Sequence, residues 1–228
     1  MTRVFDGIAD EYDRWYNTPE GAAIFREEVE CLRLLQQGRP GRWLEVGVGT
    51  GRFAYTLGIA EGVDPSPRML EMAAGRDIAT HEARAEDLPF QRSSFDGVLM
   101  ALTLCFIGSA EAALKECQRI LRPLGCLLIG TVAADGPWGR EYVEKAHRGH
   151  PVYALAHFRT GAETVELVEN AGFTLTRAAS ALFWRPGDAP PEKPRVEPGI
   201  FTEAGFLGLL FERTARGHPS AAKLKAQE

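Results

Sequence analysis

The stretch from Trp43 to Ala54, which reads W-L-E-V-G-V-G-T-G-R-F-A, constrains the fold more than any other part of the chain. An apolar run with the character of a strand ends in glycines, and apolar residues then return at helical spacing. We therefore expect a strand, a tight turn and a helix. The turn contains three residues that let a ligand approach the backbone closely: Gly47, Gly49 and Gly51.

The charge of Glu45 narrows the class of ligand for this turn. Glu45 lies two residues before Gly47, and a carboxylate there repels phosphate but suits ammonium and sulfonium groups. The dinucleotide fingerprint G-x-G-x-x-G also fails, because Arg52 stands three residues after Gly49. The stretch thus favours S-adenosylmethionine (SAM) over NAD. In the structural alternative, Glu45 accepts hydrogen bonds from amides of its own loop.

Composition and charge favour one class of protein over others. The chain has 228 residues, 45% of them hydrophobic, which suits one α/β domain. A net charge of −5 with interspersed acids and bases argues against a nucleic-acid partner. The sequence shows no signal-peptide pattern and no apolar run of membrane-spanning length, so we expect a cytoplasmic protein with no membrane partner. We expect it to be a monomer or a homodimer. The widely spaced cysteines indicate neither disulfides nor a zinc site.

Strands and helices alternate after the glycine turn, as in a doubly wound sheet. A strand ends at Asp64, Ser66 can cap the next helix, and a continuous apolar strand begins with S-F-D-G-V-L-M. Two late strands suggest a hairpin that closes the sheet edge. We expect helices at residues 3–16, from Thr18 to about Gly38, at 111–121 and at 164–171, and strands at 79–85, 126–132, 173–184 and 200–213.

Acidic residues follow the second and third expected strands. The carboxyl ends of adjacent strands meet at the ligand crevice, where Asp64 can accept both ribose hydroxyls of an adenosine. Glu86 and Asp87 fall at the same edge, and either can accept the adenine amino group. The structural alternatives are that Asp64 is a loop or cap residue and that the other two cap an exposed helix.

The segment from Ala134 to Thr160 breaks the alternation and concentrates aromatic and basic residues, including Trp138 and Tyr142. We expect it to cover the substrate end of the crevice. Its histidine spacing matches no metal-ligand motif. A hydroxyl or carbon acceptor would need a general base, and the candidates are His147, His150, Tyr153 and His157.

A series of motifs runs along the chain: L-E-V-G-V-G-T-G-R-F, G-V-D-P-S-P-R-M-L, A-E-D-L-P-F, S-F-D-G-V and L-K-E-C-Q-R-I-L-R-P-L-G-C-L. In order and spacing they resemble the motifs of class I SAM-dependent methyltransferases, over about Phe5 to Arg213. The likeness is greatest to small prokaryotic, mostly uncharacterised methyltransferases, which share G-R-E-Y and A-H-F-R-T-like sequences.

This resemblance implies a Rossmann-like α/β fold. The doubly wound sheet would have seven strands, mostly parallel with an antiparallel last strand, and helices on both faces. Residues 1–213 would form a single domain, with 134–160 as a substrate-covering insertion and 214–228 as a mobile tail.

The resemblance also implies which residues bind SAM, from its amino-acid part near Glu45 and the glycine turn to its ribose at Asp64. Relatives often carry an acid where this chain has Arg84, so the adenine contact is expected from Glu86 or from backbone amides. The expected cofactor-binding residues are Tyr12, Trp15, Tyr16, Glu45, Gly47, Gly49, Thr50, Gly51, Asp64, Pro65, Ser66, Met69, Ala85, Glu86, Asp87, Leu88, Ala101 and Leu102.

Absent motifs narrow the acceptor to a small molecule. The segment A-L-T-L-C-F lacks the D/N-P-P-Y and Pro-Cys motifs of nucleic-acid methyltransferases, and Cys105 is expected in the core. Ala101 and Leu102 offer no acid to hold magnesium. We expect metal-independent, in-line methyl transfer that yields S-adenosylhomocysteine. The alternatives are a non-catalytic SAM-binding regulatory protein and an NAD(P)-dependent oxidoreductase.

Overall fold

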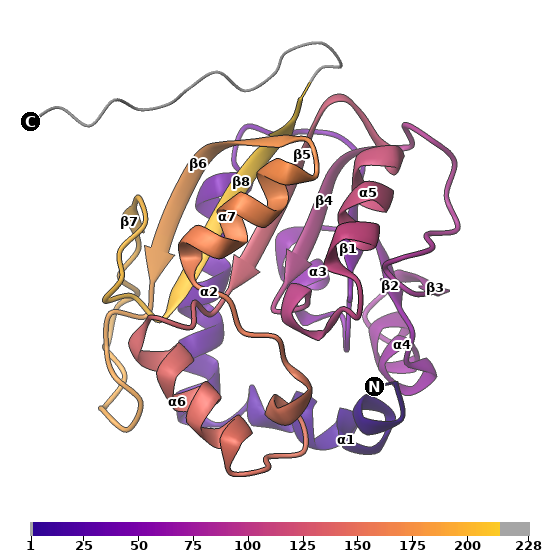
Figure 1. Cartoon of the computed structure of the whole chain (residues 1–228). Helices are drawn as coiled ribbons and strands as arrows, with labels where there is room; N and C mark the ends of the chain where they lie inside the picture. Colours follow the sequence, from indigo (N-terminus) through magenta and orange to yellow (C-terminus); the bar gives the residue numbers. More distant parts are fainter. Residues whose placement is uncertain (1, 215–228) are drawn as a thin grey trace, which may run out of the picture.

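A mixed sheet organises residues 2–214, the part of the chain that the computed structural model describes (Figure 1). Its strands lie in the order β3-β2-β1-β4-β5-β8-β6-β7. The order reverses between β1 and β4, which is where ligands bind in sheets of this kind. The strands are β1 (Trp43–Val46), β2 (Glu61–Asp64), β3 (Ala79–Glu82), β4 (Phe95–Ala101), β5 (Leu121–Thr131), β6 (Phe173–Ala181), β7 (Glu197–Pro198) and β8 (Phe206–Arg213).

The sheet has eight strands, so the expected count of seven is wrong. Strands β1 to β5 pair in parallel, and β8 is antiparallel to both β5 and β6. The expected antiparallel last strand is therefore present, but it lies inside the sheet. The additional strand, β7, pairs only Glu197 and Pro198 with β6. Such a short segment in a proline-rich loop carries no alternating pattern that could predict it.

Helices cover both faces of the sheet, as expected. In Figure 1, α5 (Ala110–Ile120) and α7 (Gly161–Asn170) lie in front of the sheet, and α2 (Pro19–Gln36) and α3 (Arg52–Leu57) lie behind it. Strand β4 alternates between the two resulting cores, with Val98 and Met100 in the first and Leu99 and Ala101 in the second. Helix α4 (Pro67–Ala74) contributes to the second core and is capped by Ser66, as expected.

Two further helices lie beyond the end of the sheet toward which the parallel strands point: α1 (Thr2–Trp15) and α6 (Pro137–His147) (Figure 1). The expected covering segment is thus partly regular, with α6 followed by a 3-10 turn, Tyr153–Leu155. Proline at the first position of α6 is compatible with a helix start.

The late strands are shorter than expected, and β8 begins at Phe206 rather than at Ile200. No helix within residues 2–214 is long and apolar enough to cross a membrane. The expected mobile tail lies outside the described residues, apart from Thr214.

Candidate active site

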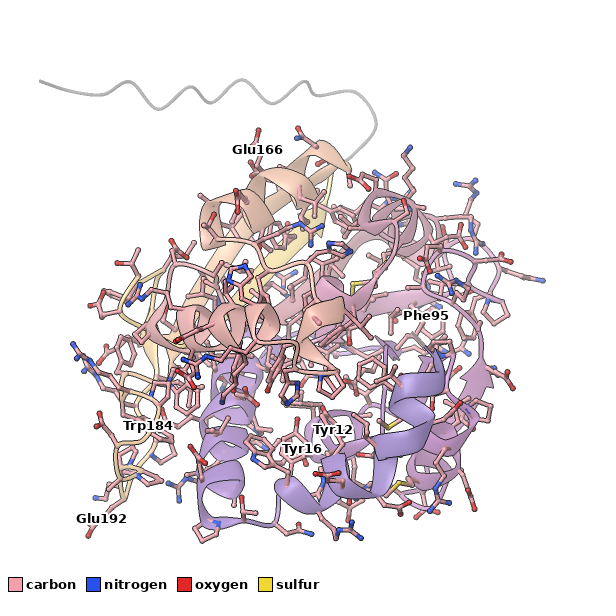
Figure 2. All side chains as sticks on the ribbon, turned by 60° about the horizontal axis from the view of Figure 1, so that its bottom comes forward. Tyr12, Tyr16, Phe95, Glu166, Trp184 and Glu192 are labelled. Atoms are coloured by element: carbon pink, nitrogen blue, oxygen red, sulfur yellow. The ribbon has the colours of Figure 1, made fainter. Side chains whose placement is uncertain are left out.

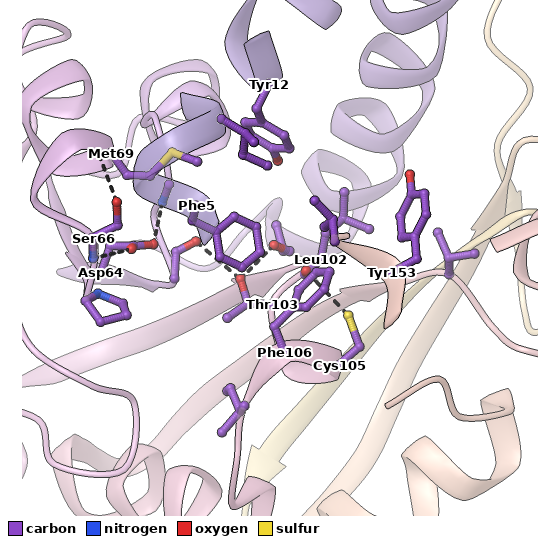
Figure 3. A pocket seen from close by; sticks show the side chains of 18 of the residues that line it. Phe5, Tyr12, Asp64, Ser66, Met69, Leu102, Thr103, Cys105, Phe106 and Tyr153 are labelled. Atoms are coloured by element: carbon purple, nitrogen blue, oxygen red, sulfur yellow. Dashed lines mark hydrogen bonds between the residues drawn. The ribbon is translucent and has the colours of Figure 1, made fainter. Parts of the chain in front are cut away.

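A cavity of about 630 Å³ lies at the carboxyl ends of the parallel strands. Helix α1, the glycine turn and the loops after β2, β3 and β4 line one part, and α2, α6 and the following turn line the other. In the close view, Asp64, Ser66 and Met69 gather at one end and Cys105 and Tyr153 at the opposite end (Figure 3). A single space therefore joins two chemically different ends.

The glycine turn presents bare backbone to this cavity. Gly49 has φ +51°, and no heavy atom lies within 4 Å of the place where a Cβ would stand. Gly47 has φ +75°, and a Cβ there would lie 2.2 Å from the Thr103 side chain. Both positions favour glycine because of their positive φ angles. In addition, Gly49 leaves open space beside the backbone, and Gly47 allows close packing against Thr103.

Asp64 is fixed at the end of β2 by its neighbours. Its Oδ2 accepts a hydrogen bond from the Gly49 amide at 3.0 Å, and its Oδ1 accepts one from the Ser66 amide at 2.9 Å (Figure 3). Burial raises the pKa of Asp64 despite these bonds. Each carboxylate oxygen has a further lone pair, so the side chain can still accept two hydroxyl donors from the cavity.

Glu45 does not line the cavity, in contrast to the expectation that it faces the ligand. Its side chain is 1% exposed, and Oε2 has no hydrogen-bond partner among the described residues. Burial raises the pKa of Glu45 well above its ordinary value, whereas a hydrogen bond from the Ala54 amide opposes the rise. Ala54 lies in the first turn of α3, whose amides need acceptors. The Ala54 amide thus accounts for one hydrogen bond to Glu45, as in the structural alternative, and Oε2 keeps no partner among the described residues.

Most of the other expected cofactor residues line the cavity, but four more do not. Thr50 and Gly51 are buried under the turn, and Asp87 is exposed. Leu88 packs in the first core, and its amide donates to Glu116. The expected residues that do line the cavity are Tyr12, Trp15, Tyr16, Gly47, Gly49, Asp64, Pro65, Ser66, Met69, Ala85, Glu86, Ala101 and Leu102.

Glu86 and Arg84 form a polar border at the Asp64 end. The Glu86 Oε1 atom accepts hydrogen bonds from Arg84 Nη2 at 3.2 Å and from the Ser109 amide at 3.3 Å. Burial opposes ionisation, but hydrogen bonds from the backbone amides of Glu86 and Ser109 and from Arg84 outweigh it and lower the pKa of Glu86. Glu86 is therefore a charged acceptor suited to an amino group.

Four tyrosines line the cavity beyond Asp64: Tyr12 and Tyr16, which were expected to contact the cofactor, and Tyr142 and Tyr153 of the cover. In Figure 3, Tyr12 lies between Met69 and Tyr153. The hydroxyls of Tyr12 and Tyr16 are 2.8 Å apart, and both rings lie near the centre of the end that faces the viewer in Figure 2. The rings of Tyr142 and Tyr153 stack with centroids 4.6 Å apart. Burial raises the pKa of Tyr12, which keeps the phenol neutral.

Two of the four candidate bases line the cavity. Tyr153 and His150 do so, whereas His147 and His157 are exposed and do not. The Nδ1 atom of His150 accepts hydrogen bonds from the Val152 and Tyr153 amides. A base from the covering segment would therefore be one of the two that line the cavity.

Trp138 and Cys105 differ from expectation. Trp138 is buried behind the cover, where its ring packs 5.0 Å from that of Trp184 and its Nε1 donates to the Trp184 carbonyl. Cys105, expected in the core, lines the cavity, and its Sγ donates to the Leu102 carbonyl (Figure 3). Burial raises the pKa of Cys105 to about 12, so the neutral thiol is a poor nucleophile.

Sequence reasoning missed two acidic residues of the cavity, Glu11 of α1, which is exposed, and Glu28 of α2, which is buried. The Glu28 side chain is 2% exposed, and its Oε2 has no hydrogen-bond partner among the described residues. Glu28 lies four residues after Ile24 and four before Leu32, both buried. This helical spacing places Glu28 on the buried face of α2, and it could have predicted the burial of Glu28.

An ion-pair cluster attaches α1 to the region beneath the cavity. Arg52 Nε lies 2.7 Å and Arg76 Nη2 lies 2.9 Å from Asp13 Oδ1. Burial of Asp13 opposes ionisation, but hydrogen bonding from Arg52 and the charge of Arg76 outweigh it and hold its pKa at about 2. Arg52, the residue that breaks the dinucleotide fingerprint, thus anchors the helix that carries Tyr12.

Comparisons with known proteins agree with this geometry. Residues 44–129 match the family described as "Methyltransferase domain". A solved structure from Thermotoga maritima, described as a SAM-dependent methyltransferase and "possible histamine N-methyltransferase", is similar with a TM-score of 0.85 and 34% identity, covering 94% of this chain and 99% of that one.

Two sequence relatives extend the comparison. An uncharacterised protein of Mycobacterium tuberculosis is 39% identical over 201 residues, which are 88% of this chain and 70% of the relative. The demethylmenaquinone methyltransferase of Tropheryma whipplei is 35% identical over 137 residues, 57% of each chain. The similarity to the Mycobacterium and Thermotoga proteins thus extends over most of this chain, well beyond residues 44–129.

Proposed function

This chain belongs to the SAM-dependent methyltransferase family, and from that premise we propose that it transfers a methyl group from SAM to a small-molecule acceptor without a metal ion. The joined cavity supports this most directly, because it offers a cofactor end at Asp64 and an enclosed aromatic end beside it. One similar structure is described as a possible histamine N-methyltransferase and one relative as a demethylmenaquinone methyltransferase, and both descriptions name small molecules.

The residues of the Asp64 end fit SAM. Gly49 leaves room that a side chain would fill, and Asp64 keeps acceptor positions for ribose hydroxyls. Glu86 is a charged acceptor for the adenine amino group, and Met69 and Ala85 add apolar contacts. When bound, SAM supplies a methyl group on a sulfonium, which is an activated leaving group.

The residues between the two ends position the acceptor. Leu102 lines the cavity with φ +54°, a conformation that costs energy for a branched side chain, and its amide donates to the Gly130 carbonyl at 2.8 Å. Such a fixed floor suits alignment of two reactants, which can lower a barrier by about 7–11 kcal/mol. Tyr12 and Tyr153 enclose the acceptor side.

Turnover tests the proposal. Purified protein is incubated with SAM and a panel of small amines, phenols and thiols, with and without a chelator, and S-adenosylhomocysteine is measured. We expect acceptor-dependent product that the chelator does not reduce. SAM binding without turnover of any acceptor would instead indicate the non-catalytic regulatory alternative.

A further inference from the structure

Two adjacent carboxylates on α2 are buried in different ways. Glu27 is 0% exposed, and both of its oxygens have partners: the Leu182 amide at 3.0 Å and Trp184 Nε1 at 2.9 Å. These bonds connect α2 to the segment after β6 and give Glu27 a structural role. Glu28, the next residue, has no such explanation.

The unpartnered state of Glu28 is costly for the folded protein. Its Oε2 atom is buried without a hydrogen bond, and no described Lys, Arg or His forms an ion pair with it. A buried carboxyl group without a partner loses its hydration and gains nothing in return. Since Glu28 lines the cavity, a ligand can supply the hydrogen-bond donor or cation that the described residues do not provide.

Four tyrosines line the same cavity as this carboxyl group: Tyr12, Tyr16, Tyr142 and Tyr153. Burial raises the pKa of Tyr12, Tyr16, Tyr142 and Tyr153, and the charge of Glu28 adds to the rise in all four, so its carboxylate is within electrostatic reach of each ring. The faces of aromatic rings attract cations. A carboxylate among such rings is a site for an organic ammonium group.

We infer that the methyl acceptor is a small organic amine whose protonated nitrogen binds Glu28 within the ring of Tyr12, Tyr16, Tyr142 and Tyr153. For methyl transfer the ammonium passes a proton to the Glu28 carboxylate, and the freed nitrogen lone pair attacks the methyl carbon as the bond from that carbon to the sulfonium sulfur breaks. This inference rests on the proposed function and adds the substrate class to it. The amine's apolar body would pack on Phe158, which lines the cavity with its ring centroid 6.3 Å from that of Tyr153.

The protonation state of Glu28 gives the inference a second consequence. Burial, and then the charge of Glu27, raise the pKa of Glu28 to about 8. Apart from Asp64, Arg84 and Glu86 at the far end, the other titratable groups that line the cavity are the tyrosines, Glu11, Cys105, His150 and Lys145. The Nζ atom of Lys145 lies 3.3 Å from Glu141 Oε1 and 5.5 Å from the centroid of the Tyr142 ring. An ammonium favours the carboxylate form, so amine binding near pH 7 should release a proton.

Matched ligands isolate the charge of the acceptor. Protein saturated with S-adenosylhomocysteine is titrated with benzylamine against benzyl alcohol, 2-phenylethylamine against 2-phenylethanol, and n-butylamine against n-butanol. Wild type should bind at least one amine about tenfold more tightly than its alcohol, on the scale of a charged hydrogen bond. Glu28→Gln should abolish this preference, whereas Glu27→Gln should retain it and lower thermal stability.

Calorimetry in buffers of different ionisation enthalpy provides a readout that needs no variant. Wild type should release most of one proton per amine bound at pH 7, and Glu28→Gln should release none. An unchanged preference in Glu28→Gln, or no amine preference in wild type for any pair, would overturn the inference.

Binding of S-adenosylhomocysteine by itself separates this inference from the proposed function. Wild type and Glu28→Gln should bind it equally. A loss confined to the variant would show that Glu28 holds the amino group of the cofactor, which overturns the amine inference. Failure of wild type to bind it would count against the proposed function instead.

Discussion

At the scale of single residues, Asp64 tests the cofactor end. Asp64→Ala should weaken binding of S-adenosylhomocysteine by about 1.5–3 kcal/mol, because it removes an acceptor for the ribose hydroxyls. Calorimetry measures this loss directly. Asp87→Ala is the matched control, since Asp87 is exposed and lies off the cavity. Equal affinity of Asp64→Ala and wild type would show that Asp64 does not bind the ribose.

Asp13 tests the anchoring of α1. Its pKa is lowered from 3.8 to about 2, so its ion pairs stabilise the fold above about pH 4 and are lost as the pH falls through 2. Asp13→Asn should lower the free energy of unfolding by about 2 kcal/mol at pH 7, with a smaller difference from wild type at pH 3. Urea unfolding at both pH values measures this.

The control for Asp13 is Asp10→Asn. Asp10 pairs with Arg68 on the surface, where its side chain is 55% exposed, and such pairs contribute little to stability. If Asp10→Asn and Asp13→Asn cost the same, the buried cluster would not be what holds α1.

The cofactor end was predictable because its residues belong to local sequence motifs. Glu45 and Glu28, whose positions were not predicted, depend on packing that such motifs do not encode. The glycine turn and Asp64 belong to short contiguous patterns whose geometry follows from the sequence. Glu45 lies in a strand buried at every position, so strand alternation could not tell which way it points. A glutamate on a helix is usually solvated, and only its phase with Ile24 and Leu32 distinguishes Glu28.

At the scale of elements, we propose that the cover formed by α6 and the following turn selects the acceptor, because residues of both line the cavity. Tyr142 and Tyr153 stack there, remote from Asp64 in the cavity. Tyr142→Ala combined with Tyr153→Ala should lower kcat/KM for the acceptor about tenfold or more, because roughly 1.5 kcal/mol of aromatic packing is lost. Affinity for S-adenosylhomocysteine should change little.

His147→Ala is the control for the cover, because His147 lies on α6 but is exposed and off the cavity. An equal loss of methyl transfer and cofactor affinity in the tyrosine variant would contradict a role confined to the acceptor. Sequence alone predicted a cover here but not its helix, since Trp138 packs in the second core whereas Tyr142 lines the cavity, and this division follows no simple helical pattern.

At the scale of the whole molecule, the sheet order brings the cofactor residues together. The ends of β1, β2 and β4 carry Gly47, Asp64 and Ala101 to one crevice, although these residues are distant in the sequence. Alternation of strands and helices predicted this arrangement. The same alternation could not predict β7, because Glu197 and Pro198 pair with the edge of β6 only in the folded sheet.

Cofactor choice is the most direct test of the account, and titration calorimetry of wild type with S-adenosylhomocysteine and with NAD measures it. The cavity predicts one S-adenosylhomocysteine per chain and no NAD binding at the same concentrations, with a thermal stability that rises only with the former. Tight binding of NAD together with no binding of S-adenosylhomocysteine would contradict the account.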